Sequence, residues 1–333
     1  MTTSYFAVGI WRHLSIGKRA VLSLLPVSLV IYGAAYMYMY HHSHEVFYGD
    51  VHRDVDSEMG LVQIMRETYK RKMQTAGMDH HLPKCILIGV EKGGTRAVLD
   101  FLGFLHPDVE VLPGEAKFFT NETRYKKGLE FYRLLMPLSF AKQITIEKSP
   151  AYFSNKNVPG QVHYMNSSIK LLLTVRNPVT RLISAYTMLL GVEKEKRSFQ
   201  AAVFDDHENV NRKSMYVKTS TYHKHLTRWL LYFPREQIHI VDGENFVRDP
   251  YYELFKIETF LGIGHKISEG NIQFNSTKGF YCMAAMNVTK CLGSEKGQKH
   301  VYVPETQLMK LRTYFKPLNE RFFEIAGIRF DWT

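Results

Sequence analysis

The hydrophobic positions follow two patterns: one long uncharged run near the N-terminus, and from residue 81 onward short apolar runs that alternate with segments of helical spacing. Residues 20–40 (AVLSLLPVSLVIYGAAYMYMY) contain no charged side chain. A helix of this length, at about 1.5 Å per residue, crosses a hydrocarbon core of roughly 30 Å. Arg12, Lys18 and Arg19 precede the run and favour a cytosolic N-terminus. The pattern predicts a type II transmembrane anchor. The alternative, a cleaved signal peptide, is disfavoured because the run is long and lacks a small-x-small cleavage site.

Residues 41–80 contain neither a long apolar run nor a sustained alternation of apolar runs and helical segments. Basic and acidic side chains are nearly balanced there, and only residues 57–73 have the spacing of a helix. We therefore expect a cytoplasmic tail at residues 1–19, the anchor at 20–40, a stem at 41–80 and a lumenal domain at 81–333.

From residue 81 onward, short apolar runs alternate with segments of helical spacing. Such runs occupy residues 85–90 (CILIGV), 144–146 (ITI), 169–175 (IKLLLTV) and 238–246 (IHIVDGENF). Continuous apolar runs are typical of strands buried on both faces of a parallel sheet, and Cys85 is expected to be a buried thiol in the first of them. The alternation predicts an α/β fold whose central, mostly parallel sheet is flanked by helices.

The first strand leads directly into a glycine turn and then a helix. Lys92, Gly93, Gly94 and Thr95 form this turn. Glycines let backbone N–H groups approach an oxyanion, and a helix N-terminus adds partial positive charge. In the nucleotide-triphosphatase loop GxxxxGK[ST] the lysine follows the glycines, whereas here it precedes them, which disfavours a kinase or ATPase. The alternative is an ordinary β–α turn that requires small residues.

Two further strands deliver cations at their C-terminal ends. Arg176 follows the run at 169–175, and Ser184 lies eight residues later in a predicted helix. Lys148 follows the run at 144–146 in the same way. Because ligands of open α/β sheets bind beyond the carboxyl ends of the strands, these cations and Lys92 are expected at one site.

Composition limits what such a site binds. Lys and Arg number 43 against 32 Asp and Glu, giving a formal net charge of +11, which points to an anionic partner: nucleic acid, acidic membrane or acidic polysaccharide. Four Asn-x-Ser/Thr sequons, at Asn121, Asn166, Asn275 and Asn287, support a lumenal position and disfavour nucleic acid. Three cysteines are too few for a disulfide-dense scaffold or a structural zinc cluster. Two of these cysteines lie close together and are able to close a short loop in an oxidising lumen.

Four segments together resemble one family. The runs GVEKGGTRA, EKSPAYF and LLLTVRNPVTRLISAY and the closing KGFYC…C…KG…FDWT are similar to the heparan sulfate glucosamine 3-O-sulfotransferases of the Golgi, within the PAPS-dependent carbohydrate sulfotransferases. The resemblance covers residues 83–333. It implies a P-loop-like sulfotransferase fold, sulfuryl transfer from PAPS (3′-phosphoadenosine 5′-phosphosulfate) to the 3-hydroxyl of glucosamine in heparan sulfate, no metal, and a single-pass type II Golgi membrane protein.

The resemblance also implies roles for individual residues. Glu115 corresponds to the catalytic base, Lys92 and Lys148 to catalytic cations, and Lys117 and Lys148 to acceptor contacts. Cys282 and Cys291 correspond to the family's disulfide. The implied contacts to PAPS are Lys92, Gly93, Gly94, Thr95, Arg96, Arg176, Ser184, Lys296, Gly297, Gln298, Lys299 and His300.

Several positions depart from the family pattern. The pattern Glu-x-His-Phe-Phe-Asp around the base has Lys117 and Thr120 here, and the residue before the loop lysine is Glu91. Because the acceptor side has changed most, two alternatives stay open: a sulfotransferase for another glycan or position, and a catalytically weak heparan sulfate binding protein. A metal reading of His223 and His225 is disfavoured, since a spacing of two puts them on different faces of a helix.

Overall fold

The computed structural model describes residues 76–285, 288–293 and 299–332. The predicted anchor at 20–40 and the helix at 57–73 lie outside the described residues. None of the helices that the structure does describe combines the length and the apolar character needed to span a bilayer. The compact unit begins at Met78, because strand β1 (Met78–His80) pairs antiparallel with β4 (Leu138–Phe140), slightly before the expected domain start at residue 81.

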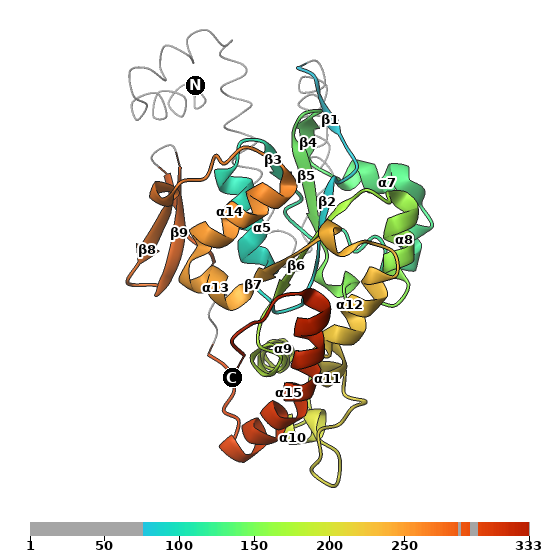
Figure 1. The fold of residues 1–333 in the computed structure, drawn as a ribbon, viewed down its shortest axis with the longest axis vertical. Coiled ribbons are helices and arrows are strands. Elements are labelled where there is room, and N and C mark those ends of the chain that lie inside the picture. Colours follow the sequence, from blue (N-terminus) through green and yellow to red (C-terminus); the bar gives the residue numbers. More distant parts are fainter. Residues whose placement is uncertain (1–75, 286–287, 294–298, 333) are drawn as a thin grey trace, which may run out of the picture. The chain divides into compact units, whose positions relative to one another are not determined.

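A five-stranded parallel sheet forms the centre of this unit (Figure 1). Its order is β3 (Val109–Val111), β5 (Ile144–Lys148), β2 (Cys85–Gly89), β6 (Lys170–Val175) and β7 (Ile238–Asp242). Every neighbouring pair is parallel, which confirms the predicted sheet. The last strand is shorter than the predicted 238–246, because the Asp242 side chain accepts from Glu244 N and Asn245 N and begins helix α13 (Gly243–Arg248).

Alternating strand residues separate the core into two layers. Ile86, Leu171 and Ile240 face a cluster that includes residues of α8 (Val158–Met165), α12 (Tyr222–Leu230) and the end of α15 (Glu305–Ala326). Cys85 and Leu172 face α5 (Thr95–Leu105) and α14 (Pro250–Leu261). The helices on the two sides are visible in Figure 1. Cys85 is fully buried, as predicted.

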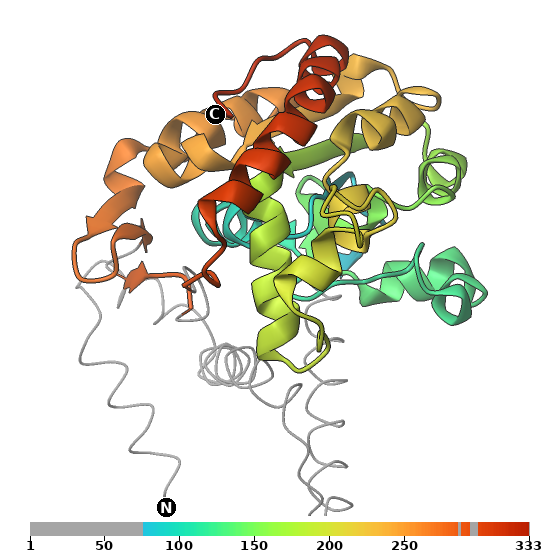
Figure 2. The same ribbon diagram turned by 90° about the horizontal axis from the view of Figure 1, so that it is seen from below.

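The remaining elements lie around these layers. A third apolar cluster joins α9 (Pro178–Gly191), α10 (Phe199–Val203), α11 (Met215–Thr219) and α15, and Figure 2 shows α15, in red, running across α9. Strands β8 (Ile272–Asn275), β9 (Phe280–Ala285) and β10 (Val288–Lys290) form an antiparallel sheet. The expected disulfide joins Cys282, in β9, to Cys291, the residue after β10. The short helices are α6 (Glu122–Tyr125), α7 (Gly128–Leu135), η1 (Pro150–Tyr152), η2 (Arg235–Gln237) and η3 (Glu269–Asn271).

Candidate active site

Charged side chains follow all five strands at the C-terminal edge of the central sheet. In strand order these are Glu115 after β3, Lys148 at the end of β5, Lys92 after β2, Arg176 after β6 and Glu244 after β7. Neighbouring strands lie about 4.8 Å apart, so the sheet order sets these groups side by side. We call this row the active edge. The strand order confirms that the predicted strand-end cations follow adjacent strands at one edge of the sheet, and that they form one ligand site stays a prediction.

The glycine turn packs main chain against main chain. A Cβ on Gly93 would lie 2.5 Å from the Thr174 carbonyl oxygen and 2.8 Å from Val90 Cγ2. Val90 N donates to the same Thr174 oxygen at 2.8 Å, which ties the turn to the end of β6. Gly94 has a φ of 96° and begins α5, whose N-terminus no side chain caps. Only glycine fits this approach, and among the described residues no side chain caps the first turn of α5.

The turn lies at the switch point of the sheet. From β2 the chain proceeds toward β3 on one side, and from β6 it proceeds to β7 on the other. A Cβ on Gly243, just after β7, would lie 2.6 Å from the Gly93 carbonyl oxygen and 2.7 Å from that of Val175. Three strand ends therefore converge where open α/β sheets bind their ligands.

Two lysines in the loops after β2 and β3 have left-handed backbone conformations. Lys92 has a φ of 65° and Lys117 a φ of 49°, and they are two of the four non-glycine residues with positive φ in the part of the chain that the structure describes. Such conformations are unfavourable for residues with a Cβ and concentrate at functional sites. Both loops, after β2 and after β3, are therefore candidates for a functional role.

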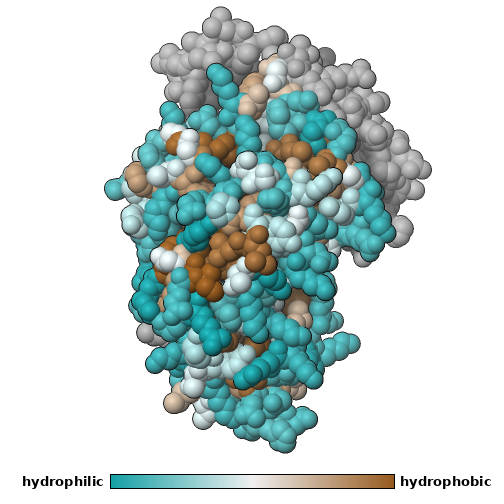
Figure 3. Space-filling view, turned by 45° about the vertical axis from the view of Figure 1, so that its right-hand side comes forward, coloured by the Kyte–Doolittle hydropathy of each residue, from teal (hydrophilic) through white to brown (hydrophobic). Residues whose placement is uncertain are grey.

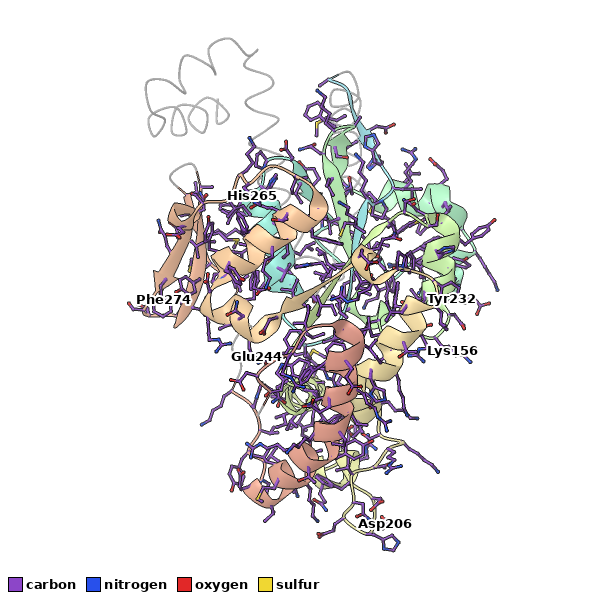
Figure 4. The ribbon with its side chains drawn as sticks, in the orientation of Figure 1. Lys156, Asp206, Tyr232, Glu244, His265 and Phe274 are labelled. Carbon is purple, nitrogen blue, oxygen red and sulfur yellow. A yellow bond between two sulfur atoms is a disulfide. The ribbon has the colours of Figure 1, made fainter. Side chains whose placement is uncertain are left out.

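Arg176 is held in place by the first turn of α13, the helix that follows the neighbouring strand β7. Its Nε lies 3.5 Å from Glu244 Oε1, and Glu244, labelled in Figure 4, also accepts a hydrogen bond from Asn177 N at 2.9 Å. Arg176 Nε is buried, and among the described residues its 3.5 Å contact with Glu244 is longer than a well-formed hydrogen bond. Burial raises the pKa of the Glu244 carboxyl, while the Asn177 hydrogen bond and the charge of Arg176 oppose that shift. A guanidinium held in this way at the end of β6 is suited to bind an anion.

The segment after the disulfide reaches the same cations. Burial lowers the pKa of His300, and the positive charges of Arg176 and Lys92 lower it further, so the imidazole lies within electrostatic reach of both. Val301 N donates to Thr187 Oγ1 at 3.2 Å and fixes the segment on α9. Lys299 is exposed. The other predicted contacts of this segment, Lys296, Gly297 and Gln298, lie outside the described residues.

Glu115 sits between two lysines. Lys148 Nζ, on a side chain that is only 7% exposed, donates to Glu115 Oε1 at 2.8 Å, and Lys117 Nζ lies 3.5 Å from Glu115 Oε2. Burial by itself raises the pKa of Glu115, but the charge and hydrogen bond of Lys148, together with Lys117, outweigh it and hold the pKa below its ordinary value. The carboxylate is therefore ionised at neutral pH, with one third of its side chain exposed to receive a proton.

A buried network that sequence reasoning missed supports this loop. Ser149 Oγ accepts from Lys117 N at 2.9 Å and donates to Glu147 Oε1 at 3.1 Å. Tyr132 Oη donates to the same Glu147 oxygen at 3.3 Å. Glu147 is fully buried, and desolvation raises its pKa to about 7. The signal in the sequence was a glutamate inside a strand, next to Lys148.

The other predicted residues have defined positions. Arg96 donates from Nε to Asp100 at 2.8 Å and from Nη1 to the Pro113 carbonyl at 2.7 Å, so its guanidinium ties α5 to the loop that carries Glu115. Thr95 is buried in the first turn of α5, and Ser184 is buried in α9. Their contacts to PAPS stay predictions. Among the described residues, no group of three or more His, Cys, Asp or Glu side chains is arranged to hold a metal ion.

Comparisons with known proteins agree with this architecture. The family model described as "Sulfotransferase domain" matches residues 82–325. The chain is 45% identical over 288 residues to heparan sulfate glucosamine 3-O-sulfotransferase 5 of Mus musculus, covering 84% of this chain and 83% of that protein. It is 39% identical over 254 residues to heparan sulfate glucosamine 3-O-sulfotransferase 6 of Homo sapiens, covering 75% and 73%.

A solved structure supports the fold. The sulfotransferase from Alicyclobacillus acidocaldarius aligns with a TM-score of 0.56 over 74% of this chain and 97% of that one, at 21% identity. The matched domain and the sequence relatives lead to one conclusion: the chain belongs to the sulfotransferase family and, within it, to the heparan sulfate glucosamine 3-O-sulfotransferases.

Proposed function

We propose that this chain transfers a sulfuryl group from PAPS to the 3-hydroxyl of a glucosamine unit in heparan sulfate, with Glu115 as general base. The observation that carries the proposal is the active edge, where a partly exposed carboxylate and three cations follow adjacent strands. The relatives named above act on this glucosamine position. In this proposal the donor side consists of Lys92, the glycine turn and Arg176, and the acceptor side of Glu115, Lys117 and Lys148.

The donor side has the chemistry that PAPS requires. PAPS carries phosphate groups and supplies the sulfuryl group when it is bound. The close approach at Gly93, the uncapped first turn of α5 and the buried Nε of Arg176 form a cradle of donors suited to an anion. Lys92 and Thr95 would hold the 5′ end, and Arg176 and Ser184 the 3′-phosphate.

On the acceptor side, Glu115 takes the proton of the attacking sugar hydroxyl, since such a hydroxyl is a poor nucleophile at neutral pH. Lys148 fixes one carboxylate oxygen at 2.8 Å, and the other, 3.5 Å from Lys117 Nζ, would accept the proton. Lys92 stabilises the negative charge that develops in the transition state, as cationic clamps do in phosphoryl transfer. Lys117, 58% exposed, is placed to contact an anionic group of the acceptor.

The proposal includes a location. Residues 20–40 would anchor the chain in the Golgi membrane as a single-pass type II protein, with the sulfotransferase domain in the lumen. The apolar run, its positive N-terminal flank and the four sequons support this. Protease protection of the domain in sealed Golgi vesicles, lost when detergent is added, is the expected result. Digestion without detergent would contradict it.

One assay tests the reaction. The lumenal domain is incubated with sulfur-labelled PAPS and heparan sulfate, and the product is digested to disaccharides and mapped. Label on 3-O-sulfated glucosamine is the expected result. Label at another position, or only on another glycan, would show that the acceptor is not the glucosamine 3-hydroxyl of heparan sulfate. PAPS binding without any transfer would support the alternative of a catalytically weak heparan sulfate binding protein.

A further inference from the structure

One of the four sequons has a defined position on the surface of the folded domain. Asn166, Ser167 and Ser168 are exposed and lie in the turn between α8 and β6. Gln237 Nε2 donates to the carbonyl oxygens of Ser167 and Ile169, at 3.0 Å each. These two hydrogen bonds hold the turn against the segment that precedes β7, so the sequon is both accessible and fixed.

The side-chain amide of Asn166 presents its nitrogen to solvent. Ser168 N donates to Asn166 Oδ1 at 2.9 Å, so the oxygen faces the turn and Nδ2 points away from this contact. In the part of the chain that the structure describes, Nδ2 of Asn166 donates no hydrogen bond. Asn245 and Asn271, by contrast, donate from Nδ2 within the protein, at 3.0 and 2.8 Å. Because N-linked sugars are attached to this nitrogen, the folded domain accommodates one at Asn166.

An exposed aromatic ring stands two residues before this asparagine. Tyr164, in the last turn of α8, is 85% exposed. Four residues earlier on the same helix face, a Cβ on Gly160 would lie 3.2 Å from three atoms of the Tyr232 side chain. Figure 4 shows Tyr232 beside α8. Tyr232 therefore covers the start of this face, and the ring of Tyr164 at its end stays uncovered.

This spacing distinguishes Asn166 from the other sequons. The residue two positions before the asparagine is a buried phenylalanine in one of them, Phe119, which is 5% exposed, and is not aromatic in the other two, Gln273 and Ala285. A single exposed tyrosine needs no explanation of its own. An exposed ring within reach of a sugar attachment site does suggest what covers it.

The surface around α8 favours a sugar over a protein as the covering group. Figure 3, with the side of α7, α8 and α12 turned forward, shows a mostly hydrophilic face on which apolar residues form separate patches. Protein partners generally occupy larger continuous apolar surfaces. One sugar ring needs only one aromatic ring, because the C–H groups on a face of the sugar pack on the negative face of the aromatic ring.

We propose that Asn166 carries an N-linked glycan whose first N-acetylglucosamine packs on the ring of Tyr164. The Cα atoms of the two residues lie at most about 7 Å apart, so a sugar on Nδ2 reaches the ring. The inference rests on the lumenal location in the proposed function, since the donor, a lipid-linked oligosaccharide, is used in the lumen of the secretory pathway. Nδ2 forms a bond to C1 of the first sugar as the bond from C1 to the lipid pyrophosphate breaks. The pyrophosphate leaves with the electron pair, and the amide proton passes to solvent.

This glycan lies away from the active edge. Asn166 precedes β6, whereas Arg176 follows it, and the six residues of this strand span about 20 Å. The glycan is therefore attached at the opposite edge of the sheet and leaves the active edge accessible.

Peptide mapping of the full chain, made in mammalian cells, tests the modification. Removing N-glycans with a glycosidase in heavy-oxygen water converts each modified asparagine to a labelled aspartate. We expect label at Asn166 in the unsubstituted chain and in Ser167→Ala, the matched control that keeps the sequon. Ser168→Ala removes the hydroxyl that the sequon requires, so its Asn166 should carry no label.

Two negative results have different meanings. An unlabelled Asn166 beside a labelled asparagine in another sequon would overturn this inference alone and leave the lumenal location standing. No label in any sequon would overturn the inference together with the lumenal location. Neither result depends on turnover, so failure of the sulfuryl-transfer assay is a separate outcome.

Thermal unfolding of the same chain tests the contact with Tyr164. Asn166→Gln should lower Tm by about 2 °C, the size expected of one weak contact in a domain of this length. The same substitution made together with Tyr164→Ala should cause no further fall, whereas together with Tyr164→Phe, which keeps the ring, it should again lower Tm. An equal fall with and without the aromatic ring would overturn the packing of the sugar on Tyr164.

Discussion

The donor side of the active edge is shaped by main chain, whereas the acceptor side is shaped by side chains that meet across the fold. On the donor side, Gly93 and Gly243 bring three strand ends into direct contact, with a missing Cβ as the deciding feature. On the acceptor side, Glu115 is positioned by Lys148, thirty-three residues away, and its loop by Ser149. A site shaped by close main-chain contacts tolerates few substitutions at its glycines. In an ion-pair network, by contrast, changing a single charge changes the pKa of the carboxylate. The predictions below separate the two, from the largest expected effect to the smallest.

Lys92→Ala should have the largest effect, a fall in turnover of about 10³-fold or more with weaker PAPS binding. It removes the cation at the end of β2 where charge develops in the transition state. Steady-state kinetics and calorimetry with PAPS measure both, with Lys142→Ala as an exposed control. Near-normal activity would remove Lys92 from the mechanism.

Glu115→Gln should lower kcat on the order of 10²-fold while PAPS affinity stays nearly unchanged, because the amide keeps the size of the side chain and cannot take a proton. This result would confine the effect to the acceptor side. If the variant keeps most of its kcat and changes the acceptor KM instead, Glu115 positions the sugar and is not the base.

Glu147→Gln tests the buried support of the acceptor side through the free energy of unfolding. The pKa of Glu147 is raised to about 7, so between pH 4.5 and 7 the folded protein keeps a proton that the unfolded chain has released. Stability therefore falls as pH rises through this window, by on the order of 2 kcal/mol.

The amide does not titrate, so the Glu147→Gln variant should lack this decline. Denaturant unfolding at pH 5 and 7 measures it, with the exposed Glu130→Gln as control. Parallel pH dependence in variant and unsubstituted protein would show that Glu147 does not carry the effect.

Arg176→Ala should raise the KM for PAPS by about tenfold with little change in kcat, since the contact to the 3′-phosphate is remote from the reacting group. This is the expected difference within the donor side between Lys92, which acts in the transition state, and Arg176, which contributes binding. Kinetics at varied PAPS, with Arg133→Ala as a surface control, measure it. An unchanged PAPS dependence would contradict the assignment.

Lys117→Ala should have the smallest effect, an upward shift of the acidic limb of the pH–rate profile by a fraction of a unit. Losing a positive neighbour lets the pKa of Glu115 rise, but Lys117 is largely exposed and its ion pair is long, at 3.5 Å. Lys148→Ala should shift the limb further, because Lys148 is buried and hydrogen-bonded. The opposite ranking would reverse the roles of the two lysines.

Much of the donor side was predictable from the sequence because its signals are local. The apolar run at 85–90, the glycines directly after it and the cation at the end of the next apolar run all lie within short windows. The hydrophobic pattern therefore identified the parallel strands, and the position of the cations directly after two of them identified the edge where Lys92 and Arg176 lie. Where the prediction was wrong, at the end of β7, a capping side chain, Asp242, ended an otherwise apolar strand pattern.

The acceptor side depended on a resemblance, since no local pattern marks Glu115. A glutamate in a loop is usually a solvated charge. The pairing with Lys148 exists because β3 and β5 are neighbours in the sheet, and strand order is not written in any window of sequence. The Ser149 and Glu147 network was missed for the same reason.

The sequence by itself determined which segments become buried strands, where the glycine turn lies and that the surface is basic. These properties depend on side-chain polarity and backbone freedom over a few neighbouring residues. Only the tertiary structure decided which strands lie side by side and which lysines hold Glu115. These features depend on contacts between segments that are distant in the sequence. Such contacts form only when the two core layers and the third apolar cluster, around α9 and α15, are buried and so fix the order of strands and helices.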